Sequence, residues 1–387
     1  MRTWCDISLD NLDYNINQIK SKVGAETKLC GIVKANAYGH GVEEIARSLI
    51  ERGFDYLAVA FIDEAVELRL DGITEVPILI LGNTPKDTVD KVVEYNITAT
   101  LYNVETARAI SAEAQKQNKT AKIHLKIDTG MSRIGFLPDS QSVDDIMEIS
   151  KLPNIEIEGI FTHFACSDEE DSSMTLRQYD KFINVVKDLE ERGLKIPIKH
   201  CCNSAAIIRF PHMHLNMVRA GIILYGMYPS DIKYDIDLKP LMQLKTTVIN
   251  IKTLNPGDTV SYGATYTVTK PTKVATIAIG YADGYSRLLS GKGRVLINGQ
   301  FANILGRICM DQCMIDVTNV HNISIGDEVI LFGADGNAKL PVEELAANIG
   351  TINYELPCVI NNRVPRCYIK NNNRIKIRNN LSVVKSL

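Results

Sequence analysis

Short apolar runs alternate with helical patterns through the first 228 residues, and this alternation narrows the available folds more than any other feature. The eight runs are rich in Val, Ile and Leu and lack clean alternation of apolar and polar residues, which is typical of strands buried on both faces. They cover residues 28–33, 55–60, 77–81, 97–102, 121–128, 155–163, 196–202 and 215–219. Eight strands with helices between them predict an α/β fold, a (β/α)8 barrel of the TIM type. An open doubly wound sheet is the weaker alternative, because no GxGxxG motif follows the first strand.

The pattern changes after residues 229–240, a polar and irregular stretch that we interpret as a linker. Beyond it, alternating strands end in turn residues, and Asn298-Gly299 between two short apolar runs predicts a β-hairpin. We therefore expect residues 1–235 to form the barrel and residues 236–387 to form a C-terminal, mostly-β domain. This assignment leaves the first few residues open to pairing with the second domain.

Composition excludes several classes of protein. Hydrophobic residues make up 45% and charged residues 23%, which is ordinary for a globular chain. The 43 Lys and Arg nearly balance the 46 Asp and Glu, so neither nucleic acid nor a membrane is indicated as a partner. Residues 1–10 do not resemble a signal peptide, and no apolar run approaches the roughly 20 residues that span a bilayer. The nine cysteines show no zinc spacing, so we expect reduced thiols, no metal site and a cytoplasmic protein.

Polar residues gather where the predicted barrel strands end, which is where barrel enzymes place their catalytic groups. These residues are Lys34 after the first strand, Lys126 and Arg133 after the fifth, His163 after the sixth, Asn203 and Ser204 after the seventh, and Arg219 after the eighth. A lysine with little water around it has a lowered pKa and forms Schiff bases with aldehydes such as pyridoxal 5'-phosphate (PLP). Taken alone, Lys34 could equally be a solvated lysine.

Two further segments of the rim suit a phosphate. Asn203-Ser204 opens a short predicted helix, and Arg219-Ala-Gly221-Ile222 supplies a turn of small residues. Loops after the seventh and eighth strands are the usual phosphate site of such barrels. Each feature also has a plain structural explanation, because Asn203 could simply cap its helix and His163 could be a hydrogen-bonded core histidine.

The second domain contributes strand ends that are rich in Tyr and Gly, around Tyr262, Tyr281 and Tyr354. Such segments usually serve packing and turns. A tyrosine aimed at a cationic site can instead carry a proton, provided that its pKa falls from the ordinary value of about 10.

Taken together and in order, these segments resemble the alanine racemase family. The matching motifs are Val33-Lys34-Ala-Asn-Ala-Tyr38-Gly-His-Gly41, Lys126-Ile-Asp-Thr-Gly-Met-Ser-Arg133, Thr162-His163-Phe-Ala, Val260-Ser-Tyr262-Gly, Gly280-Tyr281-Ala-Asp-Gly-Tyr285, Arg307-Ile-Cys-Met310-Asp311 and Tyr354-Glu355. One such motif would be weak, but seven in order across two domains are highly specific.

The resemblance implies a PLP enzyme that moves a proton between the two faces of an amino-acid Cα. Lys34 would hold PLP through a Schiff base and act as the base on one face. Tyr262, contributed by the second subunit of a homodimer, would act on the opposite face. His163 would hydrogen-bond both Tyr262 and Arg219, and Arg219 would face the ring nitrogen of PLP.

The resemblance also implies roles for the remaining residues. The phosphate would be held by Tyr38, Ser204, Gly221, Ile222 and Tyr354, and the cofactor site would also include His163 and Asn203. The substrate carboxylate would be bound by Arg133 and the backbone of Met310, with a carbamate on Lys126 beside Arg133. Asp311 would lie close to the two bases, and the entrance corridor would be lined by Tyr281, Arg287 and Arg307.

The sequence therefore predicts interconversion of L- and D-alanine, which would supply D-alanine for peptidoglycan. A racemase of serine or of basic amino acids stays open, because such pockets discriminate a methylene or hydroxyl by only ~1–3 kcal/mol. A PLP decarboxylase on the same architecture is disfavoured by Arg219, where an acidic residue is expected. A PLP carrier protein would lack the second domain, and a sugar-phosphate barrel enzyme would leave Lys34 and the tyrosines without a joint purpose.

Overall fold

The computed structural model describes residues 1–379, so the last eight residues of the expected second domain lie outside the described part. The chain forms two compact units. We call residues 13–38 and 42–238 the barrel unit, and residues 1–12, 39–41 and 239 onward the β unit. The short insertion 39–41 of the β unit directly follows Tyr38, a grouping that the sequence did not indicate.

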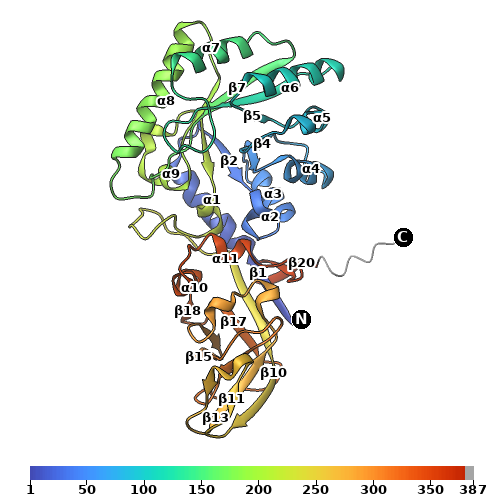
Figure 1. Cartoon of the computed structure of the whole chain (residues 1–387), viewed down its shortest axis with the longest axis vertical. Coiled ribbons are helices and arrows are strands. Elements are labelled where there is room, and N and C mark those ends of the chain that lie inside the picture. Colours follow the sequence, from blue (N-terminus) through green and yellow to red (C-terminus); the bar gives the residue numbers. More distant parts are fainter. Residues whose placement is uncertain (380–387) are drawn as a thin grey trace, which may run out of the picture. The chain divides into compact units, whose positions relative to one another are not determined.

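Eight parallel strands build the barrel unit (Figure 1). They are β2 (Lys28–Ile32), β3 (Tyr56–Val59), β4 (Ile78–Ile80), β5 (Ala99–Leu101), β6 (Ala121–Lys126), β7 (Ile155–Phe161), β8 (Ile198–His200) and β9 (Met217–Ala220). Each strand falls on one of the eight predicted apolar runs, so the prediction of these strands is confirmed.

The strands pair as two four-stranded sheets, ordered β4-β3-β2-β9 and β5-β6-β7-β8. A parallel bridge between Leu79 and Thr98 joins β4 to β5. On the other side, the backbone N–H of Asn216 donates to the carbonyl of Lys199 at 3.1 Å, next to β8 and β9. The two sheets therefore close into the predicted (β/α)8 barrel, and the open-sheet alternative is wrong.

Helices connect the strands of the barrel. They are α1 (Leu9–Lys22), α3 (Val42–Glu51), α4 (Ile62–Leu70), α5 (Val89–Glu94), α6 (Val104–Lys116), α7 (Ser140–Ile149), α8 (Ser173–Glu191) and α9 (Ser204–Arg209). In α3, Val42, Ile45, Ala46 and Leu49 are buried on one face, at the spacing of an amphipathic helix. Two residues after α3 ends, Gly53 adopts φ 75°, a conformation that terminates helices and suits glycine.

The β unit contains a ten-stranded sheet in the order β18-β17-β14-β15-β16-β13-β10-β1-β19-β20. The bounds are β1 (Thr3–Ser8), β10 (Met242–Leu254), β13 (Thr272–Ile277), β14 (Arg294–Ile297), β15 (Gln300–Leu305), β16 (Cys313–Asp316), β17 (Glu328–Asp335), β18 (Ala338–Leu340), β19 (Arg366–Lys370) and β20 (Asn373–Arg378). Two short strands, β11 (Thr259–Val260) and β12 (Tyr266–Thr267), pair separately, and α10 (Val342–Ile349) and α11 (Glu355–Cys358) complete the unit.

Two features of this sheet stand out: a hairpin that was predicted from the sequence, and the inclusion of the N-terminal strand β1. Asn298 and Gly299 both have positive φ, 49° and 71°, and connect β14 to β15 as the predicted hairpin. The N-terminal strand β1 lies between β10, to which it is antiparallel, and β19, to which it is parallel.

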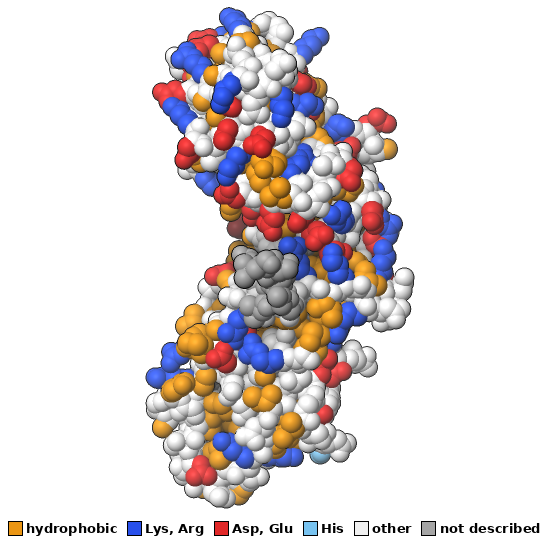
Figure 2. All heavy atoms as spheres, turned by 90° about the vertical axis from the view of Figure 1, so that its right-hand side faces the viewer, with side chains coloured by type: hydrophobic (Ala, Val, Ile, Leu, Met, Phe, Trp, Pro, Cys, Tyr) orange, Lys and Arg blue, Asp and Glu red, His pale blue; other side chains and the backbone are white. Residues whose placement is uncertain are grey.

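The visible surfaces of the two units differ in character (Figure 2). On this face, Lys and Arg side chains are interspersed with Asp and Glu over the barrel unit, whereas hydrophobic side chains are frequent on the β unit. Among the described residues, no helix combines the length and apolar character that a membrane crossing requires.

Candidate active site

Lys34 begins a left-handed turn at the end of β2. The strand ends at Ile32, one residue before the end of the predicted run at Val33, and Val33 is buried. The segment α2 (Lys34–Tyr38) then has φ of 53°, 54°, 52° and 50° at its last four residues, none of them glycine. A left-handed helical conformation costs roughly 1–2 kcal/mol per residue for L-amino acids, so the surrounding structure must hold this turn in place.

Hydrogen bonds on both sides of Lys34 stabilise the turn. The carboxylate of Glu64, on α4, accepts from the backbone N–H of Ala35 at 2.6 Å and from that of Ala60 at 2.7 Å. The Asn36 side chain accepts from the N–H of Val42 at 2.8 Å. The direction in which the chain leaves the lysine is therefore fixed by side chains from neighbouring elements.

Arg219, on β9, is the centre of the polar contacts in the barrel unit, and it is only 3% exposed. Its Nη1 donates to Nδ1 of His200 at 2.9 Å, and its Nη2 lies 3.1 Å from Nδ1 of His163 and 2.9 Å from the carbonyl oxygen of Thr162. Burial lowers the pKa of the guanidinium, but arginine remains charged in proteins. Because a guanidinium can only donate, both imidazoles must accept through an unprotonated Nδ1.

His163 lies among four basic side chains. Burial, followed by the charges of Arg219, Lys126, Arg133 and Lys34, holds its pKa well below the ordinary value. The structure thus brings together the cationic residues that were predicted at the ends of the first, fifth and eighth strands. A neutral His163 carries its proton on Nε2, which leaves that atom as a hydrogen-bond donor.

Lys126 ends β6 and is buried, with its Nζ 4.3 Å from the centre of the Phe161 ring. Burial and the charges of Arg219 and Arg133 lower its pKa well below the ordinary value. A neutral amine of this kind is a nucleophile. The loop leading to Arg133 is organised by Asp128, whose carboxylate accepts from the backbone N–H of Arg133 at 3.0 Å.

Three of the predicted phosphate-site residues meet at one corner of the barrel. The backbone N–H of Gly221 donates to Oγ of Ser204 at 3.0 Å. A Cβ built on Gly221 would lie 3.2 Å from the hydroxyl of Tyr38 and 3.4 Å from Oγ of Ser204. Ile222 follows at the start of a 3-10 turn. Asn203 caps α9 by accepting from the N–H of Ala206 at 3.1 Å, so its side chain has the structural role that was weighed for it.

The predicted residues of the β unit lie on interlocked loops. Tyr262 is 69% exposed, and next to it Ser261 donates through its hydroxyl to the carbonyl of Arg307. Tyr281 donates its backbone N–H to the carbonyl of Cys309 at 3.1 Å, and Ala282 does the same to Met310 at 3.0 Å. The loops that carry Tyr262, Tyr281, Arg307 and Met310 are therefore joined by hydrogen bonds. Arg287 begins a 3-10 turn, and Tyr354 directly precedes α11.

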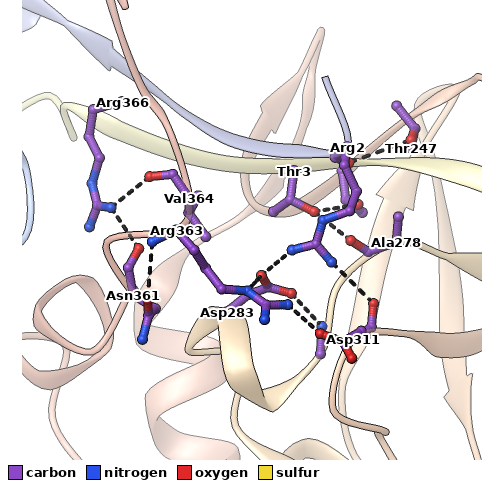
Figure 3. A network of polar contacts seen from close by, with 12 residues as sticks. Arg2, Thr3, Thr247, Ala278, Asp283, Asp311, Asn361, Arg363, Val364 and Arg366 are labelled. Atoms are coloured by element: carbon purple, nitrogen blue, oxygen red, sulfur yellow. Dashed lines mark hydrogen bonds and ion pairs between the residues drawn. The ribbon is translucent and has the colours of Figure 1, made fainter. Parts of the chain in front are cut away.

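A buried carboxylate ties the Tyr281 loop to both ends of the chain (Figure 3). Asp283 is fully buried, and Arg2 and Arg363 converge on its Oδ1. Arg363 Nε donates to that oxygen at 2.7 Å, and Arg363 also pairs with Asp311. The second carboxylate oxygen of Asp283 accepts from the backbone N–H of Gly280 at 3.0 Å.

Several residues that organise this site were not predicted from the sequence. His200 ends a buried strand, as His163 nearly does, so the rule that identified His163 would also have found it. Asp283 lies within a quoted motif but was given no role. Glu64 and Arg363 carried no recognisable signal, because their importance arises from partners that are distant in sequence.

Comparison with known proteins agrees with this geometry. Residues 7–229 match the family described as alanine racemase, N-terminal domain, and residues 241–368 match alanine racemase, C-terminal domain. The alanine racemase of Clostridium tetani is 51% identical over 379 residues, which cover 97% of each chain. The solved alanine racemase structure from Clostridium difficile 630 has a TM-score of 0.95 and 46% identity, covering 98% of both chains. A histidine racemase from Leuconostoc mesenteroides has a TM-score of 0.88 and 30% identity, covering 95% of this chain and 98% of that one. This chain belongs to the alanine racemase family.

Proposed function

We propose that this protein is a PLP-dependent racemase that interconverts L- and D-alanine. The observation that carries the proposal is the grouping of Lys34, His163 and Arg219 at one rim of the barrel, with Arg219 buried and donating to two imidazoles. Relatives that share about half of the sequence are named for this activity.

The residues present fit PLP. Among the described residues, the Nε–H of Arg219 and one hydrogen on Nη1 have no hydrogen-bond partner, so they can donate to a ring nitrogen, which is an acceptor. Tyr38, Ser204 and Gly221 form a corner that has no room for an extra side chain and can surround a phosphate with donors. Ile222, Asn203 and Tyr354 complete the proposed cofactor site. Bound PLP would take up the electron pair left on Cα when its proton is removed.

Lys34 and Tyr262 would act as bases on opposite faces of the substrate. Lys34 Nζ would accept or return the proton on one face, and the hydroxyl oxygen of Tyr262, from a second subunit, would do so on the other. His163 supports this arrangement, because its Nε2–H can donate to the tyrosine oxygen and so favour the form that accepts a proton. Arg219 keeps its own protons, so it would hold the ring nitrogen unprotonated.

A homodimer is part of this proposal. Three bulky apolar side chains of the β unit are largely exposed: Tyr262 (69%), Leu288 (63%) and Met310 (52%). These side chains are exposed, so they are available to contact a second subunit. Arg133 and the Met310 backbone would bind the substrate carboxylate, Asp311 would lie near the bases, and the entrance would be lined by Tyr281, Arg287 and Arg307.

Lys126 would carry a carbamate beside Arg133. Burial and neighbouring cations lower the pKa of its amine, which favours the unprotonated form that can add to carbon dioxide. The product is an anion that can orient the Arg133 guanidinium, whereas an ammonium would repel it. Mass analysis or electron density that shows only the free amine, with Arg133 still ordered, would contradict this modification.

We propose that the enzyme acts in the cytoplasm and supplies D-alanine for peptidoglycan synthesis. The cytoplasmic assignment is supported by the nine cysteines, all of which are free thiols. The structural relative named histidine racemase keeps one second candidate open, a racemase for a different amino acid.

An absorption spectrum followed by a D-alanine assay tests the function. A Schiff-base band that disappears in Lys34→Ala, with D-alanine formed from L-alanine, would establish both cofactor and reaction. A band without D-alanine would direct the assay to histidine, serine, basic amino acids or decarboxylation. Absence of a band after PLP is added would disprove the proposal.

A further inference from the structure

Behind Arg219, a chain of buried polar groups crosses the barrel unit, and the proposed racemase chemistry does not use it directly. We call it the Glu158–Arg219 chain, and its members are Glu158, His124, His200 and Arg219. Nη1 of Arg219 lies 2.9 Å from Nδ1 of His200, and Nε2 of His200 lies 2.9 Å from Nδ1 of His124. Nε2 of His124 then faces Oε2 of Glu158 at 3.5 Å, an electrostatic contact, since neither atom has a hydrogen-bond partner among the described residues. The chain thus joins adjacent strands β6, β7 and β8 to the arginine on β9.

Arg219 at one end of this chain and Glu158 at the other favour the same proton positions along it. Nδ1 of His200 must be unprotonated because it accepts from the guanidinium. A neutral His200 therefore carries its proton on Nε2 and donates to Nδ1 of His124. His124 in turn carries its proton on Nε2, which faces the carboxylate of Glu158. Each imidazole must be a neutral Nε2–H tautomer for the three contacts to be favourable.

The charges at the two ends of the Glu158–Arg219 chain favour the same direction of hydrogen bonding. Burial alone would raise the pKa of Glu158, but contacts with His124, Lys122 and Tyr56 outweigh it and lower the pKa to about 2. Lys122 binds the other carboxylate oxygen at 2.7 Å. Burial lowers the pKa of His124 and His200, so both rings are neutral between an anion at one end and a cation at the other.

Two features of the backbone show that the site is built for these side chains. The pairing of β6 with β7 skips Glu158, since Ile123 pairs with Ile157 and His124 pairs with Gly159. This bulge turns the carboxylate of Glu158 into the interior, where both Glu158 and Gly159 are buried. A Cβ on Gly159 would lie 2.5 Å from the His124 ring, so the glycine makes room for the imidazole.

His200 is held in orientation by an aromatic contact. Its ring stacks on Phe161, with ring centres 4.7 Å apart and an angle of 7° between the planes. The stack fixes the plane of the ring, and the contacts of Nδ1 with Arg219 and of Nε2 with His124 fix which nitrogen faces the arginine. With the ring oriented in this way, only the position of the imidazole proton can still vary at the contact between His200 and Arg219.

We propose that Glu158, acting through His124 and His200, is a positioning residue that keeps the unprotonated nitrogen of His200 facing Arg219. The consequence for catalysis rests on the proposed function, in which Arg219 faces the ring nitrogen of PLP. Without the carboxylate, His124 can protonate on Nδ1, and its N–H then opposes the N–H of His200. His200 must in response move its proton to Nδ1, where it repels the guanidinium of Arg219.

Glu158→Gln tests this proposal, because it removes the charge and keeps the shape. Glu156→Gln is the matched control, since Glu156 lies two residues earlier on β7, is exposed, and approaches the same Lys122 at 3.9 Å. Nitrogen-15 NMR of imidazole-labelled enzyme, with and without PLP, reports which nitrogen of His200 carries the proton. We expect the Nε2–H tautomer in the wild-type and Glu156→Gln proteins, and a substantial Nδ1–H population in Glu158→Gln.

Activity gives a second readout. We expect kcat for D-alanine formation to fall roughly 3- to 30-fold in Glu158→Gln, as for residues that act through a packed network. Glu156→Gln should stay within about twofold of wild type. His124→Phe, which keeps an aromatic ring but removes both nitrogens, should also shift the His200 tautomer. An unchanged tautomer in both Glu158→Gln and His124→Phe would overturn the proposal, and so would an equal loss of activity in Glu156→Gln. Because the tautomers are observable without turnover, failure of racemisation in the wild type would count against the proposed function alone.

Discussion

Glu64 accepts a hydrogen bond from the backbone N–H of Ala35, the residue that follows Lys34, at 2.6 Å. The second oxygen of the same carboxylate holds the N–H of Ala60 at 2.7 Å, at the end of the neighbouring strand β3. One side chain thus links the strained turn after Lys34 to the adjacent rim of the barrel. This is how the unfavourable backbone conformation of four consecutive residues is maintained.

Glu64→Ala should lower the free energy of unfolding by about 2 kcal/mol, because two backbone donors lose a charged acceptor. The same variant should bind PLP more weakly, since Lys34 loses its fixed approach. Urea denaturation and PLP titration measure the two effects. Asp63→Ala on the same helix is the control, and loss of its exposed pair with Lys91 should cost less than about 1 kcal/mol. Equal effects of the two variants would show that Glu64 has no special role in the turn.

Gly221→Ala should weaken PLP binding about tenfold or more without unfolding the chain. The new methyl group would press on the hydroxyls of Tyr38 and Ser204, and overpacking of this kind costs about 1–3 kcal/mol. Equilibrium titration of the apoenzyme with PLP measures the change. Gly24→Ala provides the comparison, because its added methyl would meet only Thr27, at 4.0 Å. Unchanged affinity in Gly221→Ala would remove this corner from the cofactor site.

Asp283→Asn should destabilise the folded protein by about 3 kcal/mol, because a fully buried carboxylate is lost between two arginines. Asp311→Asn shares the partner Arg363 but lies at a half-exposed position, so we expect a cost below about 1 kcal/mol. Thermal and urea unfolding of both variants supply the measurement. If Asp311→Asn destabilised the protein more than Asp283→Asn, Asp311 would be the more important carboxylate of this cluster.

Stability should fall as the pH drops below about 6.5, the ordinary pKa of histidine. Burial lowers the pKa of His124, His163 and His200, so the folded protein leaves them neutral while the unfolded chain binds protons. Each such histidine makes the free energy of unfolding decrease by up to about 1.4 kcal/mol per pH unit. Urea denaturation across mildly acidic pH measures the slope, with exposed His212→Asn as a control that should leave it unchanged. A flat profile would mean that the buried rings become protonated in the folded state.

Local patterns predicted the fold well because the barrel strands are buried on both faces and therefore apolar. The rim residues also followed, since the ends of parallel strands meet on one side of a barrel. The left-handed turn at residues 35–38 did not follow, because three of its four residues are alanine or tyrosine, which rarely adopt positive φ. The contacts of Asp283 with Arg2 and Arg363 were equally inaccessible, since they join residues far apart in sequence.

The position of β1 has a consequence for the order in which the parts of the chain can fold. This strand precedes the barrel in the chain, yet both of its partners, β10 and β19, are made after the whole barrel. Contacts that close such long loops form slowly, and unpaired apolar strands are prone to aggregate. The nascent protein must therefore keep the edges of Thr3–Ser8 unpaired until β10 and β19 have been made, and its ten-stranded sheet cannot be completed before the barrel has been synthesised.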